Sequence, residues 1–423
     1  MLLLTLFACA DDPCADLEGP RLWVFGSGSD ARLEGNDTRT FGTLGAALAA
    51  AEDGTNICVA PGVYRERVEV GGHGVGVYGA GPELVVIEPL ATLDDPRDAD
   101  TPLVRITGAG TTVSGMTLQG SGVGVFVEAD AGGVLRDLEV LDNRVGVIAE
   151  DPHELRLQDV DVERNSEQGV RLTARGIDTP TVQVVGGRIV GNGHPDNSNV
   201  GGLSAEHDLW LEGVTFRDNA GTTGGDVWTT GAIRGTGVSV ERPVLELPDV
   251  PRLTAGNGLE LSTSTLHVLG SPAAEVACTD GQLLLENVAI ADNATGVVPD
   301  LVHTTNCGGR VVHATLVSMG EGTQGSGLAL EGSGTVEVVN TAFGGFQVAV
   351  GSSSHRGSLT LDHTFEGGLT DIALMRPLAS ATDLRPQEDS PLVNAGVESD
   401  VLVDLDGNER PQGGAPDIGA YEH

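Results

Sequence analysis

The stretch LRLQDVDVERN, residues 155–165, sets a pattern that returns along the chain. It reappears as LWLEGVTFRDN at 209–219 and as LLLENVAIADN at 283–293. Each copy ends in asparagine and places apolar residues ten, eight, five and three positions before it. A spacing of two puts side chains on one face of a strand, and the extra residue between the two pairs indicates a bend. The pattern therefore predicts very short strands joined by corners.

Asn143 and Asn192 end weaker copies, in which glycine replaces one of the apolar residues. The asparagines at 143, 165, 192 and 219 are 22, 27 and 27 residues apart, which is one turn of a right-handed parallel β-helix. We expect this all-β, single-stranded solenoid to span residues 57–375. Roughly a dozen coils at about 4.8 Å would give a rod on the order of 60 Å.

The repeated asparagines are predicted to face an inner corner of the solenoid. There each amide bonds backbone groups and its own copies in neighbouring coils. A row of ligand-binding amides is the less favoured alternative. The expected ladder consists of Asn143, Asn165, Asn192, Asn219 and Asn293.

Composition limits what the chain does. Of 423 residues, 62 are glycine and only 3% are aromatic, which suits narrow stacked layers better than a wide core. The formal net charge is −38 and every basic residue is arginine. The absence of lysine excludes Schiff-base chemistry, and the negative charge argues against nucleic acid as a partner. We expect a monomer with a solvated acidic surface.

The N-terminal residues Leu6-Phe7-Ala8-Cys9 resemble the lipobox of bacterial lipoproteins. The resemblance implies that residues 1–9 form a signal, that Cys9 carries lipid, and that the protein is exported and held at the bacterial outer membrane or cell surface. Only eight residues precede Cys9, and none is basic, so a short hydrophobic terminus is the alternative.

The remaining four cysteines form an even set that allows three pairings. Export into an oxidising compartment favours disulfides over free thiols. The favoured pairs are Cys14 with Cys58 and Cys278 with Cys307, because the second pair is about one repeat apart and would staple neighbouring coils.

The two ends of the chain carry further resemblances. Residues 43–70, TLGAALAAAEDGTNICVAPGVYRERVEV, are similar to the opening of pectinesterase-like extracellular β-helix proteins and of a related group of unknown function. This implies a capping helix at LGAALAAA, within an N-terminal segment of residues 10–56. Residues 404–423, DLDGNERPQGGAPDIGAYEH, resemble the closing motif of choice-of-anchor Q surface proteins, which implies a C-terminal cap over residues 376–423.

Within this cap, Asp404, Asp406 and Asn408 have the alternating oxygen ligands of a calcium loop. The glutamate that closes such a loop is missing, because position 415 is alanine. An ordinary Asp-Gly turn is favoured, and a structural calcium ion is the alternative. We expect no other cofactor.

Asp151-Pro152-His153-Glu154 resembles a motif of mannuronan epimerases, which use an aspartate, a histidine and a tyrosine. The tyrosine position holds Ile148, and the acidic position of the next coil falls near Thr173. Asp151, His153 and Glu154 are therefore weak catalytic candidates. Because Asp-Pro is a turn signal, a corner of the scaffold is the favoured interpretation.

His194 and Asp196, together with Trp210 and Trp228, are weak candidates for a carbohydrate platform, and a polar loop with partly buried tryptophans is the favoured interpretation. The sequence thus favours a lipid-anchored, non-catalytic cell-surface β-helix protein that acts in adhesion or glycan contact. A polysaccharide lyase, epimerase or hydrolase is the second hypothesis. A polyanionic uronate would be repelled by the net charge of −38.

Overall fold

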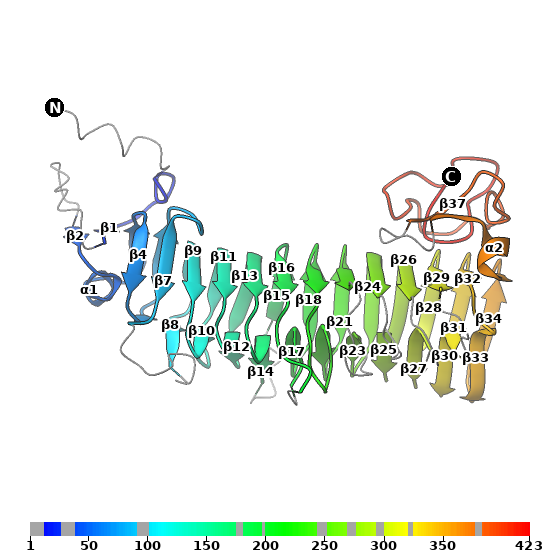
Figure 1. The fold of residues 1–423 in the computed structure, drawn as a ribbon, viewed down its shortest axis with the longest axis horizontal. Coiled ribbons are helices and arrows are strands. Elements are labelled where there is room, and N and C mark those ends of the chain that lie inside the picture. Colours follow the sequence, from blue (N-terminus) through cyan, green and yellow to red (C-terminus); the bar gives the residue numbers. More distant parts are fainter. Residues whose placement is uncertain are drawn as a thin grey trace. The chain divides into compact units, whose positions relative to one another are not determined.

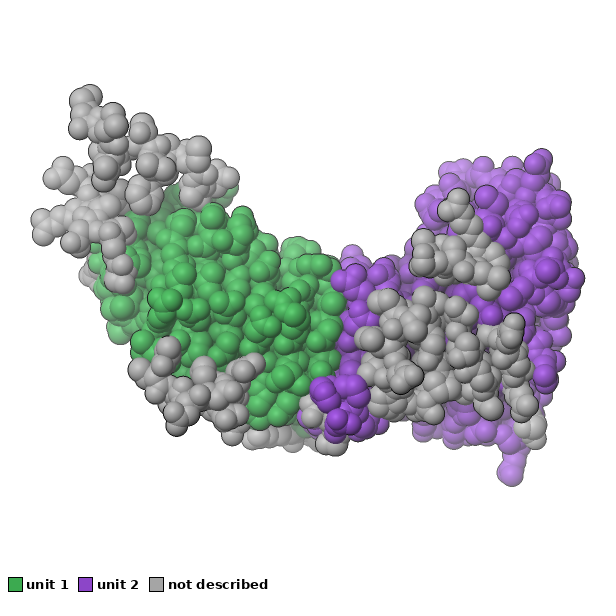
Figure 2. Space-filling model, in the orientation of Figure 1, with its two compact units in different colours: residues 1–193 green, residues 194–423 purple. Residues whose placement is uncertain are grey.

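The chain forms a parallel β-solenoid of about 11 turns with 3% helix, so the predicted parallel β-helix is confirmed. The computed structural model describes residues 12–26, 39–90, 101–174, 181–196, 199–242, 252–268, 276–292, 300–319, 325–376 and 383–423. The chain divides into two compact units, residues 1–193 and 194–423, which are treated separately (Figures 1 and 2).

Unit 1 winds between a larger and a smaller parallel sheet and carries helix α1 (Leu44–Ala49). The larger sheet contains β1 (Arg21–Val24), β2 (Arg39–Phe41), β3 (Asn56–Val59), β4 (Gly62–Arg65), β6 (Gly76–Gly79), β7 (Val85–Glu88), β9 (Thr111–Gln119), β11 (Gly133–Leu141), β13 (Glu154–Glu163), β15 (Thr181–Val185) and β16 (Arg188–Val190). The smaller sheet contains β5 (Val68–Val70), β8 (Pro102–Ile106), β10 (Val123–Val127), β12 (Val145–Glu150) and β14 (Gln168–Thr173). Parallel pairing begins at β1, which pairs with β3 and lies inside the segment expected to precede the solenoid.

Unit 2 repeats the winding (Figure 1). Its larger sheet contains β18 (Leu209–Glu212), β19 (Thr215–Arg217), β21 (Ile233–Thr236), β22 (Ser239–Arg242), β24 (Leu259–Val268), β26 (Gln282–Asp292), β28 (Gly308–Val312), β29 (Thr315–Ser318), β31 (Thr335–Val339), β32 (Ala342–Gly344), β34 (Ser358–Asp362) and β35 (Phe365–Gly367). Its smaller sheet contains β17 (Leu203–Ala205), β20 (Val227–Thr229), β23 (Leu253–Ala255), β25 (Val276–Thr279), β27 (Val302–Thr305), β30 (Ser326–Gly332) and β33 (Val348–His355). Helix α2 (Leu369–Ile372) and the antiparallel pair β36 (Leu374–Arg376) and β37 (Asp383–Pro386) follow.

The apolar repeat forms the inner layers of the coils. In β13, Leu155, Leu157, Val160 and Val162 are all at most 3% exposed. Of the two residues between the pairs, Asp159 has φ of 52°, a left-handed conformation that small polar residues tolerate. This bend lets both pairs point inward although their spacing is odd. Bend residues with positive φ in other coils include Gly115, Asp137, Gly213, Gly237, Thr263, Asn287, His313, Asn340 and His363.

Three asparagines occupy one inner corner of unit 1. Asn143, Asn165 and Asn192 are fully buried. The backbone N–H of Asn143 donates to Asn165 Oδ1 at 3.1 Å, and that of Asn165 donates to Asn192 Oδ1 at 3.0 Å. Asn165 Nδ2 donates to the carbonyl of Val140 at 3.1 Å. The amides thus satisfy corner backbone groups, as buried polar groups require.

The fourth asparagine of the pattern has a different partner in unit 2. Asn219 is 1% exposed, and its Nδ2 donates to Asp226 Oδ1 at 2.7 Å. Asn293 lies outside the described residues. Among the described residues, amide bonds from coil to coil join Asn143, Asn165 and Asn192.

Helix α1 begins where the sequence predicts and ends two residues earlier, at Ala49. Thr43 Oγ1 accepts from the N–H of Ala46 at 3.2 Å, and the Glu66 carboxylate accepts from the N–H groups of Leu44 and Gly45 at 2.8 and 2.9 Å. Four N–H groups at a helix start lack partners within the helix, so these bonds cap it. Glu66, in the connection between β4 and β5, thereby fixes the helix to the first coils.

Residues 61–66, PGVYRE, contain Glu66 and also Tyr64, and the tyrosine has a structural role as well. The Tyr64 hydroxyl donates to the carbonyl of Ala60 at 2.7 Å, and the ring is 3% exposed. Burial raises the pKa of Tyr64 to about 12, so the phenol stays protonated. The tyrosine and glutamate of this segment thus stabilise the N-terminal coil.

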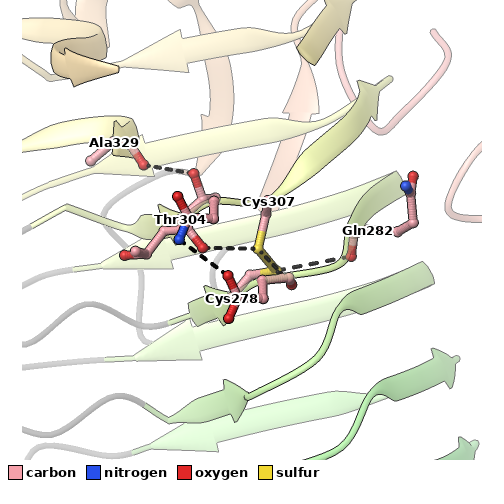
Figure 3. The surroundings of a disulfide bond; sticks show 8 residues. Cys278, Gln282, Thr304, Cys307 and Ala329 are labelled. Atoms are coloured by element: carbon pink, nitrogen blue, oxygen red, sulfur yellow. Dashed lines mark hydrogen bonds between the residues drawn. A yellow bond between two sulfur atoms is a disulfide. The ribbon is translucent and has the colours of Figure 1, made fainter. Parts of the chain in front are cut away.

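Both expected disulfides are present. Cys14 is joined to Cys58 in β3, and Cys278 in β25 is joined to Cys307 just before β28, with Cα atoms 5.9 and 6.5 Å apart. The second bond links successive coils of unit 2 (Figure 3). Beside it, Thr304 Oγ1 donates to the carbonyl of Ala329 in the following coil at 3.3 Å.

The C-terminal segment, residues 383–423, docks on the bend residues of unit 2. Asn287 Nδ2 donates to the carbonyl of Val403 at 2.6 Å, and Asn340 Nδ2 donates to that of Val397 at 2.7 Å. Apolar residues of the segment, including Tyr421, share one buried cluster with residues of β26 and β29. Figure 1 shows the segment in red against the ends of these strands.

Candidate functional site

Asp151, His153 and Glu154 lie at the corner between β12 and β13. Asp151 has φ of 49°, and its N–H donates to the carbonyl of Thr173 at 2.8 Å. The N–H of His153 donates to the carbonyl of Ala131 at 2.9 Å, while the side chains of His153 and Glu154 are exposed. In the part of the chain that the structure describes, no hydrogen bond or ion pair joins these three side chains. The local geometry is that of a corner whose backbone is held by neighbouring coils.

The two tryptophans of the candidate carbohydrate platform are not brought together, which corrects the sequence-based grouping. His194 Nδ1 lies 3.5 Å from Asp196 Oδ2, with side chains 61% and 91% exposed. Trp210 belongs to β18 in the larger sheet, whereas Trp228 belongs to β20 in the smaller sheet. The chain changes sheet between them, so the two indoles lie on different faces of the solenoid.

Trp210 is the centre of a different arrangement on the outer side of the larger sheet. It is 41% exposed and lies opposite Arg234 of β21 in the parallel register. Arg234 lies opposite Glu260 of β24, which lies opposite Leu284 of β26. The two neighbouring rows that we call the Trp210 face are Trp210, Arg234, Glu260 and Leu284, and Glu212, Thr236, Ser262 and Glu286.

Arg234 fixes the orientation of the indole. Its Cζ lies 5.0 Å from the centroid of the Trp210 ring, a cation–π distance. Its Nη1 is 3.1 Å from Asp208 Oδ2, and its Nε is 3.6 Å from Glu260 Oε2. Asp208 is itself held, because its Oδ1 accepts from the N–H of Ala232 at 2.8 Å. One face of the indole therefore lies against the Arg234 guanidinium, while Trp210 as a whole stays 41% exposed.

Hydroxyl groups border the indole and its arginine. Thr236 Oγ1 and Ser262 Oγ lie 2.9 Å apart in the second row of the face. The face also carries the carboxylates of Asp208, Glu212, Glu260 and Glu286. Its two rows as described contain one cation, Arg234, and the first row continues beyond Leu284 to Arg310 of β28. The face thus combines an aromatic surface, hydroxyl donors and acceptors, and an excess of carboxylates.

A histidine between two carboxylates lies on the smaller sheet of unit 2. His303 in β27 has Nδ1 3.5 Å from Asp300 Oδ2 and Nε2 3.7 Å from Glu331 Oε2. Asp300 Oδ1 in turn accepts from the N–H of Ser326 at 2.8 Å. The hydrogen bond to Asp300 raises the pKa of His303. Burial pushes the pKa of Asp300 upward, but its hydrogen bonds with His303 and Ser326 outweigh burial and leave that pKa lowered.

No motif in the sequence points to His303. Asp300 and His303 are three residues apart in the chain, which is a weak signal on its own. Glu331 joins them only through the pairing of β27 with β30. Aligning the coils by their strand register would have placed the three groups together.

The predicted calcium residues form a closed turn in the C-terminal segment. Asp404 is fully buried and accepts from the N–H of Asn408 at 2.7 Å, from Asn408 Nδ2 at 3.0 Å and from the N–H of Glu422 at 2.9 Å. Asp406 instead pairs with Arg385 at 2.7 Å. Among the described residues, no three His, Cys, Asp or Glu side chains are grouped to hold a metal ion. The calcium ion stays a prediction.

Cys9 of the proposed lipid anchor lies outside the described residues. Within the ranges that the structure covers, no helix has the length and apolar character needed to cross a membrane.

Two solved structures are similar to this chain at low sequence identity. No family model and no curated protein matches the chain. The solved structure of pectate lyase Pel9A is similar at 14% identity and a TM-score of 0.46, covering 98% of this chain and 99% of that one. A pectin methylesterase mutant solved with a hexasaccharide is similar at 13% identity and a TM-score of 0.39, covering 59% of this chain and 80% of that one. Both neighbours are parallel β-helix proteins, and the activities in their names are theirs.

Proposed function

We propose that the protein is a lipid-anchored β-helix protein of the bacterial cell surface that contacts glycans through the Trp210 face, without catalysis there. The observation that carries the proposal is the 41% exposed indole of Trp210, held by Arg234. Sugar rings stack on indole faces, and a few placed polar groups fix their orientation. An indole that is already immobilised loses little freedom on binding.

The shape of the face suits an extended ligand. Its rows cross β18, β21, β24 and β26, which are neighbours in the parallel register. Strands lie about 4.8 Å apart, so four of them present contact points over about 14 Å. A glycan chain lying across the strands would meet the indole at one end and the Thr236 and Ser262 hydroxyls along its path.

Export to the cell surface has support that is independent of this face. Two disulfides indicate an oxidising compartment. The Leu6-Phe7-Ala8-Cys9 pattern supplies the proposed lipid attachment. A chain held at the surface by one end would present its coils to external glycans, which is the arrangement that adhesion requires.

The test is a glycan-binding screen with purified full-length protein, followed by titration calorimetry. We expect Trp210→Ala to reduce affinity for any glycan that binds by at least tenfold, since indole anchors commonly account for 2 kcal/mol or more, at about 1.4 kcal/mol per tenfold. Trp228→Ala, on the other sheet, is the matched control and should bind like the wild type. Unchanged glycan binding by Trp210→Ala would show that this face is not the binding site. Product formation that is lost in Trp210→Ala would show that the face is catalytic.

A polysaccharide-active enzyme is the second candidate, and the His303 cluster is the observation that favours it. A histidine oriented at Nδ1 by one carboxylate is a recurring arrangement of general bases. Long incubation of the same glycans with wild type and His303→Gln, with products separated by chromatography, tests this function. Turnover that is lost in the variant supports an enzyme, and the absence of turnover in the wild type argues against it.

A further inference from the structure

The charges around Trp210 carry an inference that rests on the proposed function. We infer that the Trp210 face selects glycans whose sugars carry protonated amino groups over otherwise identical N-acetylated sugars and over uronates. The ligand class is therefore an amino-sugar oligomer, recognised by stacking on Trp210 and by ion pairs to the carboxylates in the neighbouring row.

The cations in and beside the face already have acidic partners. Arg310, which lies opposite Leu284, is paired with Glu337 at 3.1 Å and with Asp400 at 3.0 Å. Arg234 lies over the Trp210 ring and is flanked by Asp208 at 3.1 Å and Glu260 at 3.6 Å. A guanidinium that stacks on an indole and contacts two carboxylates has little capacity left to bind a carboxylate ligand. Glu212 and Glu286, which form no ion pair in the described ranges, would therefore repel a uronate.

The remaining carboxylates are available to a cationic ligand. Glu212 is exposed, Glu286 is half-buried, and within the described ranges neither forms an ion pair. Both lie in the second row, on strands that carry Trp210 and Leu284 in the first row. An ammonium group donates up to three hydrogen bonds, and those to carboxylates are shorter and stronger than neutral ones.

The field of the whole chain acts in the same direction. The net charge is −38, and no lysine is present to create a positive patch. Such a surface attracts cationic ligands and repels anionic ones, and the effect weakens as salt rises. A neutral N-acetylated sugar would stack on the indole but would gain nothing from these charges. Selectivity thus arises from the acidic second row, whereas basal affinity arises from Trp210.

Three hexasaccharides test the inference: a glucosamine hexamer, an N-acetylglucosamine hexamer and a galacturonate hexamer. Affinities would be measured by calorimetry at a pH where amines are protonated and carboxylates ionised. We expect the glucosamine hexamer to bind several-fold more tightly than the acetylated one and the uronate to bind least. Raising the ionic strength to about 1 M, where the Debye length is about 3 Å, should remove most of the preference.

Charge-removing variants locate the effect. Glu212→Gln and Glu286→Gln should each reduce the amine preference about two- to five-fold, as expected for ion pairs at a solvent-accessible surface. Glu154→Gln, an exposed carboxylate at a corner of unit 1, is the matched control and should keep the preference.

The outcomes separate this inference from the proposed function. Equal binding of the amino and acetylated hexamers, with both lost in Trp210→Ala, would overturn the selectivity and leave glycan contact at the face intact. A preference that persists in both glutamate variants would also overturn it. If none of the hexamers, nor any other glycan of the screen, bound to the wild type, the proposed function itself would fail.

Discussion

Arg410 Nη1 lies 2.6 Å from Glu422 Oε2, and the two side chains are 2% and 0% exposed. Arg410 Nη2 also donates to Asn287 Oδ1 in β26 at 3.1 Å and to the carbonyl of Gly419 at 3.0 Å. This buried pair therefore ties the C-terminal segment to a bend residue of the solenoid. A buried charge that loses its partner is strongly unfavourable.

Arg410→Ala should lower the free energy of unfolding by about 3–5 kcal/mol, because Glu422 would keep a buried charge without its cation. Urea denaturation followed by circular dichroism measures the loss, and limited proteolysis shows whether the C-terminal segment is released first. The double variant Arg410→Met/Glu422→Leu removes both charges and should recover part of the stability. If Arg410→Ala unfolded at the same urea concentration as the wild type, the Arg410–Glu422 pair would not hold the C-terminal segment in place.

Asn165→Ala should destabilise unit 1 by about 2–4 kcal/mol. The change leaves the buried N–H of Asn143 and the buried carbonyl of Val140 without their partners, and each buried unsatisfied group costs about 1–3 kcal/mol. Thermal unfolding of the purified variant provides the measurement. Arg156→Ala, an exposed change on the same coil, should stay within about 0.5 kcal/mol of the wild type. Similar stability of the two variants would contradict the structural role of the amides.

Removing the disulfide between successive coils of unit 2 should also destabilise the protein. The Cys278–Cys307 bond closes a 29-residue separation, for which restricting the unfolded chain gives about 3–4 kcal/mol. The double variant Cys278→Ala/Cys307→Ala, compared with the wild type under non-reducing conditions, measures this difference in chemical denaturation. An unchanged midpoint would mean that the bond is absent or without effect on stability.

The C-terminal segment should loosen in acid because of His313. Burial, followed by the nearby Arg410 guanidinium, lowers the pKa of His313 to about 3. Its Nε2 also faces Ser399 and Asn340, each at 3.0 Å, and Asp400 is the nearby acid. Histidine in the unfolded chain has a pKa of about 6.5, so between these values only the unfolded state binds the proton. Stability is therefore complete above about pH 6.5 and falls as pH falls towards about 3.

Within this pH range the unfolded state binds one more proton at His313 than the folded state does. The unfolding equilibrium constant therefore rises roughly tenfold for each pH unit of acidification. Urea midpoints measured from pH 7 to about pH 4 should fall more steeply for the wild type than for His313→Asn. His153→Asn, an exposed histidine in unit 1, should keep the wild-type slope. Parallel slopes for wild type and His313→Asn would contradict the burial of a neutral imidazole.

The winding of the chain was predictable because its signal is local and repeated. Leu155 and Val160 face inward because they occupy the apolar positions of the repeat. The odd spacing between the two apolar pairs indicates the bend at Asp159. The corner at Asp151 was predictable too, because the Asp-Pro pair is a local turn signal. Local turn chemistry and strand period act within a few residues, so the sequence displays them directly.

The composition of the faces was not predictable in the same way. Trp210 and Trp228 are close in sequence, yet the chain changes sheet between them. Arg234 meets Trp210 only through the register of β18 and β21, and connections of unequal length hide that register. Arg410 meets Asn287, 123 residues away, through docking of the C-terminal segment. Tertiary pairings of this kind leave no periodic trace in the sequence.

The most direct test of the account is a crystal structure of the protein with the tightest-binding hexasaccharide. The account predicts a sugar ring in van der Waals contact with the Trp210 indole and polar contacts to groups of β18, β21 and β24. A sugar seated instead over Trp228 or beside His303, with the Trp210 face bare, would contradict it.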